Sequence, residues 1–486
     1  MLHALSAPPP QPGRRPRLAC LGLAAAAMLA GCAQLPDPVP MPDPKPGSAY
    51  ATAESLRAPA AAWPENRWWQ AYGDRQLDTL VDEALAGAPD MAAAAARLQR
   101  AASYTQVAGA ALLPQLGAGA SATQSRFSSN YLTPANMLPD GWNDVGQATL
   151  ELRWELDFWG ANRATLAAAT SELEAAGAEF AQARLLLAAA VSAQYAELGR
   201  LQANRDTAAR SVEIRARSAE LVAERHHNGL ETRGNLRQAD AGRAAAEGVL
   251  LAVDERIALQ RNRLAALLGA GPDRGLAISA PTLRLDRGFG LPAEIGAELL
   301  GRRPDVVAAR LQAQAQARRI DAAEAAFYPN VNLSAMIGLQ SLGVDNLTRS
   351  GSTMGSVGPA LSLPIFTGGR LRGQLRGAQA AYAESVARYD QTVAHALQEV
   401  ADAAVSLKAL GPRLAKAEEA LQAATEAHRV ARERYDGGLA SYLEVLSAED
   451  VLLSSLNTLT DLRAGSLSLD VALQRALGGG YHVATR

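Results

Sequence analysis

Four segments of the chain alternate apolar and polar residues with a period of two. The clearest lies between Leu150 and Phe158, where every second residue is a leucine, tryptophan or phenylalanine and each residue in between is charged. Successive side chains of a β-strand point to opposite faces, so this alternation predicts a strand with one apolar and one charged face. We expect four strands, at about residues 114–125, 147–158, 329–340 and 356–366.

The length of these strands fits two kinds of sheet. A strand of a transmembrane barrel needs about 9–11 residues, with lipid-facing and lumen-facing positions alternating. A half-buried sheet of a soluble domain produces the same alternation. The strand pattern by itself leaves both kinds open, and other parts of the chain decide between them.

Two long segments predict helices that are much longer than usual. Residues 163–225 contain no proline, and residues 370–434 contain only Pro412, where we expect a kink or a short break. At about 1.5 Å per residue each helix would extend about 95 Å. Ordinary helices have three or four turns, so helices of this length belong in a long bundle. Helices about half as long are expected at about residues 89–112, 236–269, 304–327 and 442–476.

The second half of the chain repeats the first, with a period of roughly 210 residues. Pro89 matches Pro304 at the start of a predicted helix, and Gly229 matches Gly438 in the turn after a long helix. Each repeat reads as helix, strand, loop, strand, long helix, turn and helix. We therefore expect a duplicated chain, with repeats at residues 65–275 and 276–478 and a tail at 479–486.

The N-terminal residues have the pattern of a secretory signal peptide, which we expect at residues 1–31. Three arginines precede an apolar run at residues 18–29. That run is too short for a signal anchor, because about 20 residues are needed to span a bilayer. The sequence then reaches Gly31 and Cys32 in a pattern that resembles a lipobox, which predicts cleavage between these two residues and acylation of Cys32. Ala33 at the next position favours sorting to the outer membrane.

Residues 32–64 follow the proposed lipid anchor and are rich in proline, with one at every second position from Pro36 to Pro46. Proline lacks an N–H and disfavours both helix and strand pairing, so we expect an extended tether without helix or ladder. Cleavage would remove Cys20 and leave Cys32 as the single thiol, so the mature chain cannot form an internal disulfide.

Composition and motifs exclude several classes of function. With 47 basic against 49 acidic residues and a formal net charge of -2, there is no electrostatic case for a nucleic-acid partner. No apolar run after the signal peptide could span a membrane as a helix, so a crossing would have to be a barrel. His226 and His227 point about 100° apart on a helix and form no ligand pair. We expect no enzyme activity, no cofactor and no metal site.

The landmarks of this chain resemble the outer-membrane factor family, the group of TolC, OprM and NodT. The likeness covers nearly all of the mature chain, and the glycines at residues 478–480 resemble the end of the lipoprotein subgroup that serves efflux systems of the resistance-nodulation-division (RND) kind. The segments that carry the resemblance are residues 69–74, 154–160, 363–370, 434–435 and 438–446.

The resemblance implies a mostly α fold with membrane β structure. Four strands from each protomer would form a 12-stranded barrel in a homotrimer, continuous with a long periplasmic α-helical barrel. The strand count also calls for an oligomer, because a membrane barrel needs at least eight strands. The family implies an outer-membrane channel of a tripartite pump, in contact with outer-membrane lipid, a periplasmic adaptor (membrane fusion protein) and an inner-membrane RND transporter. Such a pump exports drugs or other small toxic compounds.

In the family, the turns between the helices of each hairpin close the periplasmic mouth and receive the adaptor. By position these are residues 225–236, called here the first tip, and residues 434–445, the second tip. Gly229 and Gly438 suit the left-handed conformation that ends a helix, so a purely structural role also explains them. The residues that resemble adaptor-docking positions are Gly229, Leu230, Thr232, Gly438, Leu439 and Ser441.

A periplasmic gate is also implied by the resemblance. Tyr435 and Glu444 lie where TolC-like proteins have a tyrosine and an aspartate that help to hold the mouth closed, Asn235 lies at an aspartate position, and Arg434 is a neighbouring cation. The chain departs from TolC at Ala440 and Ser447, which replace a gate arginine and an aspartate, so an arginine contact of the TolC kind is not expected. A solvated helix face is the alternative for Glu444.

Two further functions share part of this pattern. A TolC-like duct for type I protein secretion has the same fold, and the lipobox disfavours it. A lipid-tethered periplasmic coiled-coil scaffold would explain the helices, but it has no use for four amphipathic strands. The sequence does not identify the transported compounds, because a duct accepts what its pump delivers.

Overall fold

The computed structural model describes residues 39–128, 130, 135–137, 139–284, 288–293 and 295–482. The predicted signal peptide at residues 1–31, with Gly31, and the predicted lipid site Cys32 lie outside these residues, as do the last four residues of the predicted tail. Within the described part of the chain, no helix is long and apolar enough to cross a membrane.

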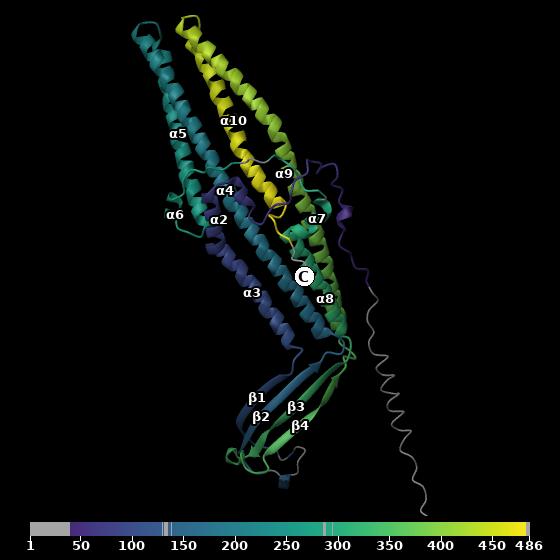
Figure 1. The fold of residues 1–486 in the computed structure, drawn as a ribbon. Coiled ribbons are helices and arrows are strands. Elements are labelled where there is room, and N and C mark those ends of the chain that lie inside the picture. The colour runs from purple at the N-terminus through teal and green to yellow at the C-terminus, as the bar shows by residue number, and fades with distance from the viewer. Residues whose placement is uncertain are drawn as a thin grey trace, which may run out of the picture. The chain divides into compact units, whose positions relative to one another are not determined.

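The order of elements confirms the predicted duplication (Figure 1). The long helices α4 and α9 each have 67 residues, the helices that follow them, α5 and α10, each have 35, and α3 and α8 each have 22. The first half contains α2 (Arg75–Gly87), α3 (Pro89–Ala110), β1 (Gln115–Ser125), β2 (Asn143–Leu156), α4 (Ala161–His227) and α5 (Arg233–Leu267). The second half contains α6 (Asp273–Leu276), α7 (Ile295–Arg302), α8 (Pro304–Ala325), β3 (Asn330–Leu342), β4 (Thr353–Ser362), α9 (Arg370–Asp436) and α10 (Tyr442–Ala476).

Helix α9 continues through Pro412, so the predicted short break is wrong. Proline removes one backbone hydrogen bond from a helix. That loss is small for a helix of this length, because packed residues hold it on both sides of the proline. Ala404 before it and Ala417 after it are both buried.

The chain divides into two compact units, and the strands belong to the first, which comprises residues 102–172 and 313–385. The four strands form one antiparallel sheet in the order β1-β2-β3-β4 (Figure 1). Leu150 is paired with Ile337, and Leu152 is paired with Ala335. Directly paired residues share a face, so the predicted apolar faces of the strands join into one apolar face. It is exposed in the single chain, with Ile337 61% accessible.

Two of the strands end earlier than predicted, β2 at residue 156 instead of 158 and β4 at 362 instead of 366. Asp157 leaves the strand because its carboxylate accepts hydrogen bonds from the backbone N–H groups of Asn162 and Arg163, at 3.1 and 2.9 Å, in the first turn of α4. After β4, Pro364 has no N–H to offer a neighbouring strand. Helix capping and proline therefore overrule a pattern that continues in the sequence.

The second unit comprises residues 43–101, 173–312 and 386–486. Its largest core is built around the aromatic residues that open the first repeat, with Trp69 and Tyr72 almost fully buried. The Tyr72 hydroxyl donates to Asp470 at 2.7 Å, and Tyr195 of α4 donates to Asp74 at 2.9 Å. These hydrogen bonds connect the start of the first repeat to α10 and α4.

Residues 39–64 differ from the extended tether that proline content predicts. They contain a short 3-10 turn at Gly47–Ala49 and a single parallel bridge between Ala60 and Leu291. The bridge forms although proline has no backbone N–H to donate. Pro59 contributes only its carbonyl, which accepts from the Leu291 N–H at 2.9 Å. Tyr50 and Trp63 pack on a buried cluster, so residues 50–63 are attached to the second unit.

Candidate functional site

The candidate site consists of the two tips, which lie in the second unit at the ends of the helical hairpins α4–α5 and α9–α10 (Figure 1). Each hairpin turns at a glycine with a left-handed backbone, Gly229 at φ 75° and Gly438 at φ 73°. The residue after each glycine donates its N–H back to the helix, Leu230 to the Arg225 carbonyl at 2.8 Å and Leu439 to that of Arg434 at 2.7 Å. This is the arrangement of a glycine helix terminus.

The docking residues that the sequence predicts divide into structural and exposed positions. Thr232 precedes α5 and its hydroxyl accepts from the Asn235 N–H at 3.2 Å. Ser441 precedes α10, and its N–H donates to Glu444 at 3.3 Å. The two leucines differ from these capping residues, because Leu230 is 65% exposed and Leu439 is 74% exposed. An exposed leucine at each tip is available to another protein.

Glu231 is the centre of the contact between the two tips. Its carboxylate accepts from the Tyr435 hydroxyl at 2.7 Å, from the Asn235 side chain at 2.7 Å and from the Thr232 N–H at 2.8 Å. Burial alone would raise the pKa of Glu231, but these hydrogen bonds, together with the charge of Arg225, outweigh it and hold that pKa below its usual value. Glu231 is therefore ionised when it receives the tyrosine hydrogen bond.

Arg225 reaches from the first tip to the second. Its guanidinium donates to the Tyr435 carbonyl at 3.1 Å and lies 4.5 Å from the centre of the Tyr435 ring. Tyr435 is 1% exposed, and burial, followed by the hydrogen bond to Glu231, raises its pKa. The tyrosine therefore stays protonated and remains a donor, so one aromatic side chain joins two charged groups of the other tip.

Below these polar contacts the two hairpins share an apolar cluster. Tyr435 and Tyr442 lie with ring centres 6.0 Å apart, and both are buried. Leu236 packs against this cluster from α5. The polar contacts and the cluster together hold the two tips of one chain in contact. The other buried members of the cluster are Ala219, Val222, Ala239 and Val445.

The structure brings the predicted gate residues together in two groups. Tyr435 and Asn235 both contact Glu231, whereas Glu444 lies in the second tip, where its carboxylate accepts from Arg434 at 3.4 Å. Within one chain Tyr435 therefore bonds Glu231 and not Glu444. Arg434 also donates to the Leu439 carbonyl at 3.2 Å, which links it to the turn.

Sequence reasoning did not assign a gate role to Glu231 or Arg225. Comparison of the two repeats could have indicated Glu231. This residue stands 209 positions before Ala440, so the first tip has a charge where the second tip has alanine. A charge that only one of two repeated tips carries is a candidate for a contact between them. No group of three or more potential metal-ligating side chains occurs among the residues that the structure describes.

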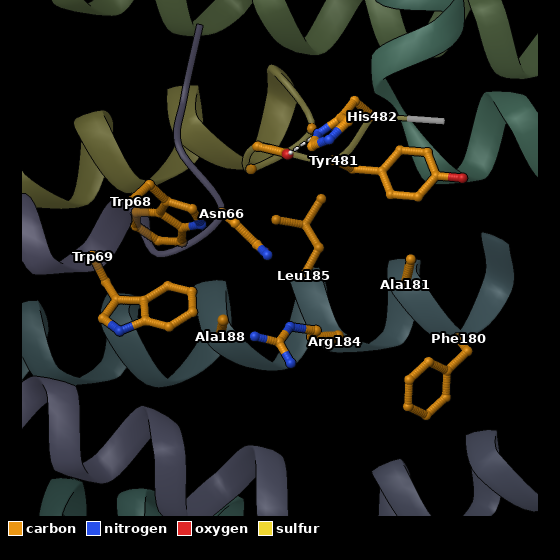
Figure 2. Close-up of a pocket in the computed structure, with 13 residues that line it drawn as sticks. Asn66, Trp68, Trp69, Phe180, Ala181, Arg184, Leu185, Ala188, Tyr481 and His482 are labelled. Carbon is orange, nitrogen blue, oxygen red and sulfur yellow. Dashed lines mark hydrogen bonds between the residues drawn. The ribbon is translucent and has the colours of Figure 1, made fainter. Parts of the chain in front are cut away.

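A pocket of about 340 Å³ lies in the same unit, between α4 and the end of the chain (Figure 2). Trp68, Phe180 and Arg184 line it, together with Tyr481. The glycines at residues 478–480 form part of the wall, and all three have left-handed φ angles. A Cβ at Gly478 would lie 2.0 Å from a backbone oxygen of Arg302, so these glycines serve close packing.

The duplicated helical hairpins and the antiparallel strands with one exposed apolar face define the class of outer-membrane channel proteins. The family model of the "outer membrane efflux protein" matches residues 80–270 and 296–479. The chain belongs to this family, and it is a transport channel and not an enzyme. The predicted family and fold class are thus confirmed.

Curated relatives and a solved structure agree with this assignment. The chain is 39% identical over 383 residues to the fusaric acid resistance protein FusA of Burkholderia cepacia, covering 76% of this chain and 70% of the relative. It is 30% identical over 472 residues to the multidrug resistance outer membrane protein MdtP of Escherichia coli, covering 96% of each. The crystal structure of the outer membrane protein VceC from Vibrio cholerae superposes with a TM-score of 0.81 at 47% identity, covering 86% of this chain and all of that one.

Proposed function

We propose that this protein is the outer-membrane channel of a tripartite pump of the RND type, and that it exports drugs or other small toxic compounds from the periplasm to the exterior. The observation that carries the proposal is one chain that has both an exposed apolar sheet face and long helical hairpins with paired tips. The resistance functions in the names of FusA and MdtP support a small-molecule cargo.

The working unit in this proposal is a homotrimer. The described part of each chain supplies one sheet of four strands, which is half of the eight strands that the smallest membrane barrels need. Three sheets side by side supply enough strands for a closed barrel, and their apolar faces would meet the lipid. Acylation of Cys32 would add an anchor in the outer membrane, since several acyl chains on one residue give stable attachment.

The tips are the proposed docking site for the periplasmic adaptor, through which the channel would meet the inner-membrane transporter. Leu230 and Leu439 are exposed and occupy matching positions of the two repeats. A trimer would therefore present six similar apolar tips, two from each chain. That arrangement suits an adaptor protein that binds both tips with related surfaces.

The same tips form the proposed gate. Tyr435 of the second tip bonds Glu231 of the first, and Arg225 holds the backbone beside Tyr435. Opening the mouth requires the α9–α10 hairpin to leave the α4–α5 hairpin, so these bonds must break. Glu444 and Arg434 form an exposed pair on the second tip, where they can meet the neighbouring protomers.

The proposal is tested by purifying the full-length chain from membranes with detergent and adding it to planar lipid bilayers. We expect a trimer that inserts and produces single-channel currents. A monomer, or a trimer without any current at high protein concentration, would show that the chain is not a channel and would favour a scaffold.

A further inference from the structure

Glu449 of α10 is a buried carboxylate close to the tips. It has no exposed surface, and both of its oxygens contact α4. The Arg215 Nε lies 2.8 Å from one oxygen, and the Ser218 hydroxyl donates to the other at 2.8 Å. A buried charge is stable only when it is paired and hydrogen-bonded, so Glu449 depends on α4.

Arg215 has a second acidic partner, so Arg215 depends less on Glu449 than Glu449 depends on Arg215. Its guanidinium also contacts the carboxylate of Asp450, whose side chain is 64% exposed. If Glu449 loses its charge, Arg215 keeps Asp450. If α10 leaves α4, Glu449 loses its cation and remains in an apolar environment next to Tyr442 and Val445.

His428 of α9 is the third member of this group. Its Nε2 is buried and makes no hydrogen bond in the described structure. Burial lowers the pKa of His428, and the nearby Glu449 acts in the opposite direction, while Arg432 on the same helix adds to the lowering. His428 is therefore mostly neutral at neutral pH in the observed arrangement.

Another ion pair between α4 and α10 is more exposed. Arg200 reaches Asp461 at 2.7 Å, with 52% of the aspartate side chain accessible. Water screens an exposed pair of this kind, which contributes little to the association of two helices. Glu449 is thus the buried charge at the contact between α4 and α10. Loss of its charge should weaken the association of these two helices more than loss of the Asp461 charge.

We propose that Glu449 is a positioning residue of the periplasmic mouth, which holds α10 against α4 through Arg215 and Ser218, and that protonated His428 takes over as its partner when the two hairpins separate. This inference rests on the proposed function, because it concerns how the proposed gate opens. It adds a buried, proton-dependent contact to the tip bonds of Tyr435.

The direction of the pH effect follows from which helices move together. His428 and Glu449 both belong to the α9–α10 hairpin, so this pair survives separation from α4. Protonated His428 would then neutralise the charge that Arg215 leaves behind, and its pKa rises in the open state. The open state binds the proton more tightly, so acid favours opening. The effect begins as the pH falls through the raised pKa of the open state and is complete below the lowered pKa of the observed state, so the range extends to either side of about 6.5, the usual pKa of histidine.

Charged groups from three helices surround His428 directly or through Glu449. Glu449 and Arg432 act on it from α10 and α9, and Arg215 of α4 holds Glu449. Tyr442 stays neutral, because burial, with Glu449 second, raises its pKa. Among these groups, His428 is the one that can gain a positive charge near neutral pH and become a new partner for Glu449.

The test uses the full-length trimer in planar bilayers and measures the fraction of time in the open state at about pH 7.5 and about pH 5.5, on either side of the usual histidine pKa. The variant Glu449→Gln should open about tenfold more often than the wild type at the higher pH. The matched control Asp461→Asn removes an exposed carboxylate from the same helix contact and should leave the open fraction within about twofold. Equal effects of the two variants would overturn the proposal.

The proton dependence is tested with His428→Gln. The wild type should open more at the lower pH, whereas His428→Gln should show the same open fraction at both, and Glu449→Gln should also lack the response. A wild-type pH response that persists in His428→Gln would contradict the role of this histidine. If Glu449→Gln does not assemble, Ser218→Ala removes one hydrogen bond to Glu449 and should raise opening about threefold; an unchanged open fraction would overturn the role of Glu449.

A further variant separates this inference from the proposed function. Tyr435→Phe weakens the tip contact and should raise opening in any channel that is gated at the tips. If Tyr435→Phe raises the open fraction and Glu449→Gln leaves it unchanged, the inference is overturned and the proposed function stays intact. If neither the wild type nor any variant conducts, the proposed function fails, and the inference fails with it.

Discussion

At the scale of single residues, equivalent positions of the two repeats have acquired different chemistry. Glu231 and Ala440 occupy the same place in the two tips, and only the first carries a charge. That charge receives the buried Tyr435 hydroxyl from the other tip. The duplication explains why the hairpins match in shape, and the difference at this position explains how they bind each other.

Removal of the Tyr435 hydroxyl tests this contact. A hydrogen bond to a charged group contributes about 1.5–3 kcal/mol, and partial exposure of Glu231 reduces the effect, so Tyr435→Phe should weaken closure by about 1 kcal/mol. Single-channel recordings should then show an open fraction several times that of the wild type. Tyr104→Phe, at an exposed tyrosine of α3, is the matched control and should not change it. An unaltered Tyr435→Phe channel would place the constriction elsewhere.

The low pKa of Glu231 predicts where this contact responds to acid. Burial raises that pKa, but the hydrogen bonds from Tyr435, the Thr232 backbone and Asn235 outweigh it while the two tips are in contact. The stabilisation by Glu231 is therefore fully present above the ordinary value of about 4.5 and is lost as the pH falls below it. Conductance measured against pH should therefore rise in a step below about pH 4.5. Glu231→Gln should lack that step. The same step in Glu231→Gln would assign it to another group.

The residues of the tips could be predicted from the sequence only in part. The glycines and the capping residues are local features, and Gly229, Gly438 and Thr232 act within their own turn. The bond from Tyr435 to Glu231 joins residues 204 positions apart. Its partner depends on how two hairpins are aligned, which no local pattern encodes.

At the scale of elements, periodicity was a reliable guide to which elements exist and a poor guide to their ends. Alternation predicts the strands because side-chain direction has a period of two. The end of β2 depends on Asp157, which bonds the first turn of α4 instead of extending the strand. In α9 the single proline, Pro412, does not break the helix, because packing on both sides keeps the helix continuous.

The apolar face of the sheet gives a prediction for paired substitutions. Leu152 lies on that face, beside Ala335, and Arg153 lies on the other. Leu152→Arg should destabilise the assembled trimer by about 2–4 kcal/mol if the residue is near the bilayer midplane, whereas Arg153→Gln should change it by less than about 0.5 kcal/mol. Urea unfolding in lipid vesicles measures both. Similar losses for the two variants would mean that the faces do not differ in environment.

At the scale of the whole molecule, the duplicated chain and its family define an outer-membrane efflux channel. The number of strands in one chain calls for additional copies, which are part of the proposal. The residues that would attach the N-terminus to lipid are defined by a local sequence pattern. Lipid attachment therefore stays a prediction from the sequence, whereas no local pattern predicts the contacts between protomers.

Lipid attachment is tested at Cys32. We expect Cys32→Ser to abolish acylation and to leave the precursor uncut, because the thiol is the acceptor in the lipobox pattern. Labelling of growing cells with radioactive palmitate, followed by gel analysis of the purified chain, measures this. Label in the Cys32→Ser chain would show that the acceptor is another residue.

The central claim is that this chain carries small toxic compounds out of the cell as part of a pump. The most direct measurement is the accumulation of a fluorescent drug in the native host, with the gene deleted and then restored. We expect that deletion raises accumulation severalfold and that the wild-type chain restores the low level. A chain with Leu230→Asp and Leu439→Asp, which still forms trimers, should not restore it. Accumulation that does not change on deletion, for any of a panel of drugs and aromatic acids, would contradict it.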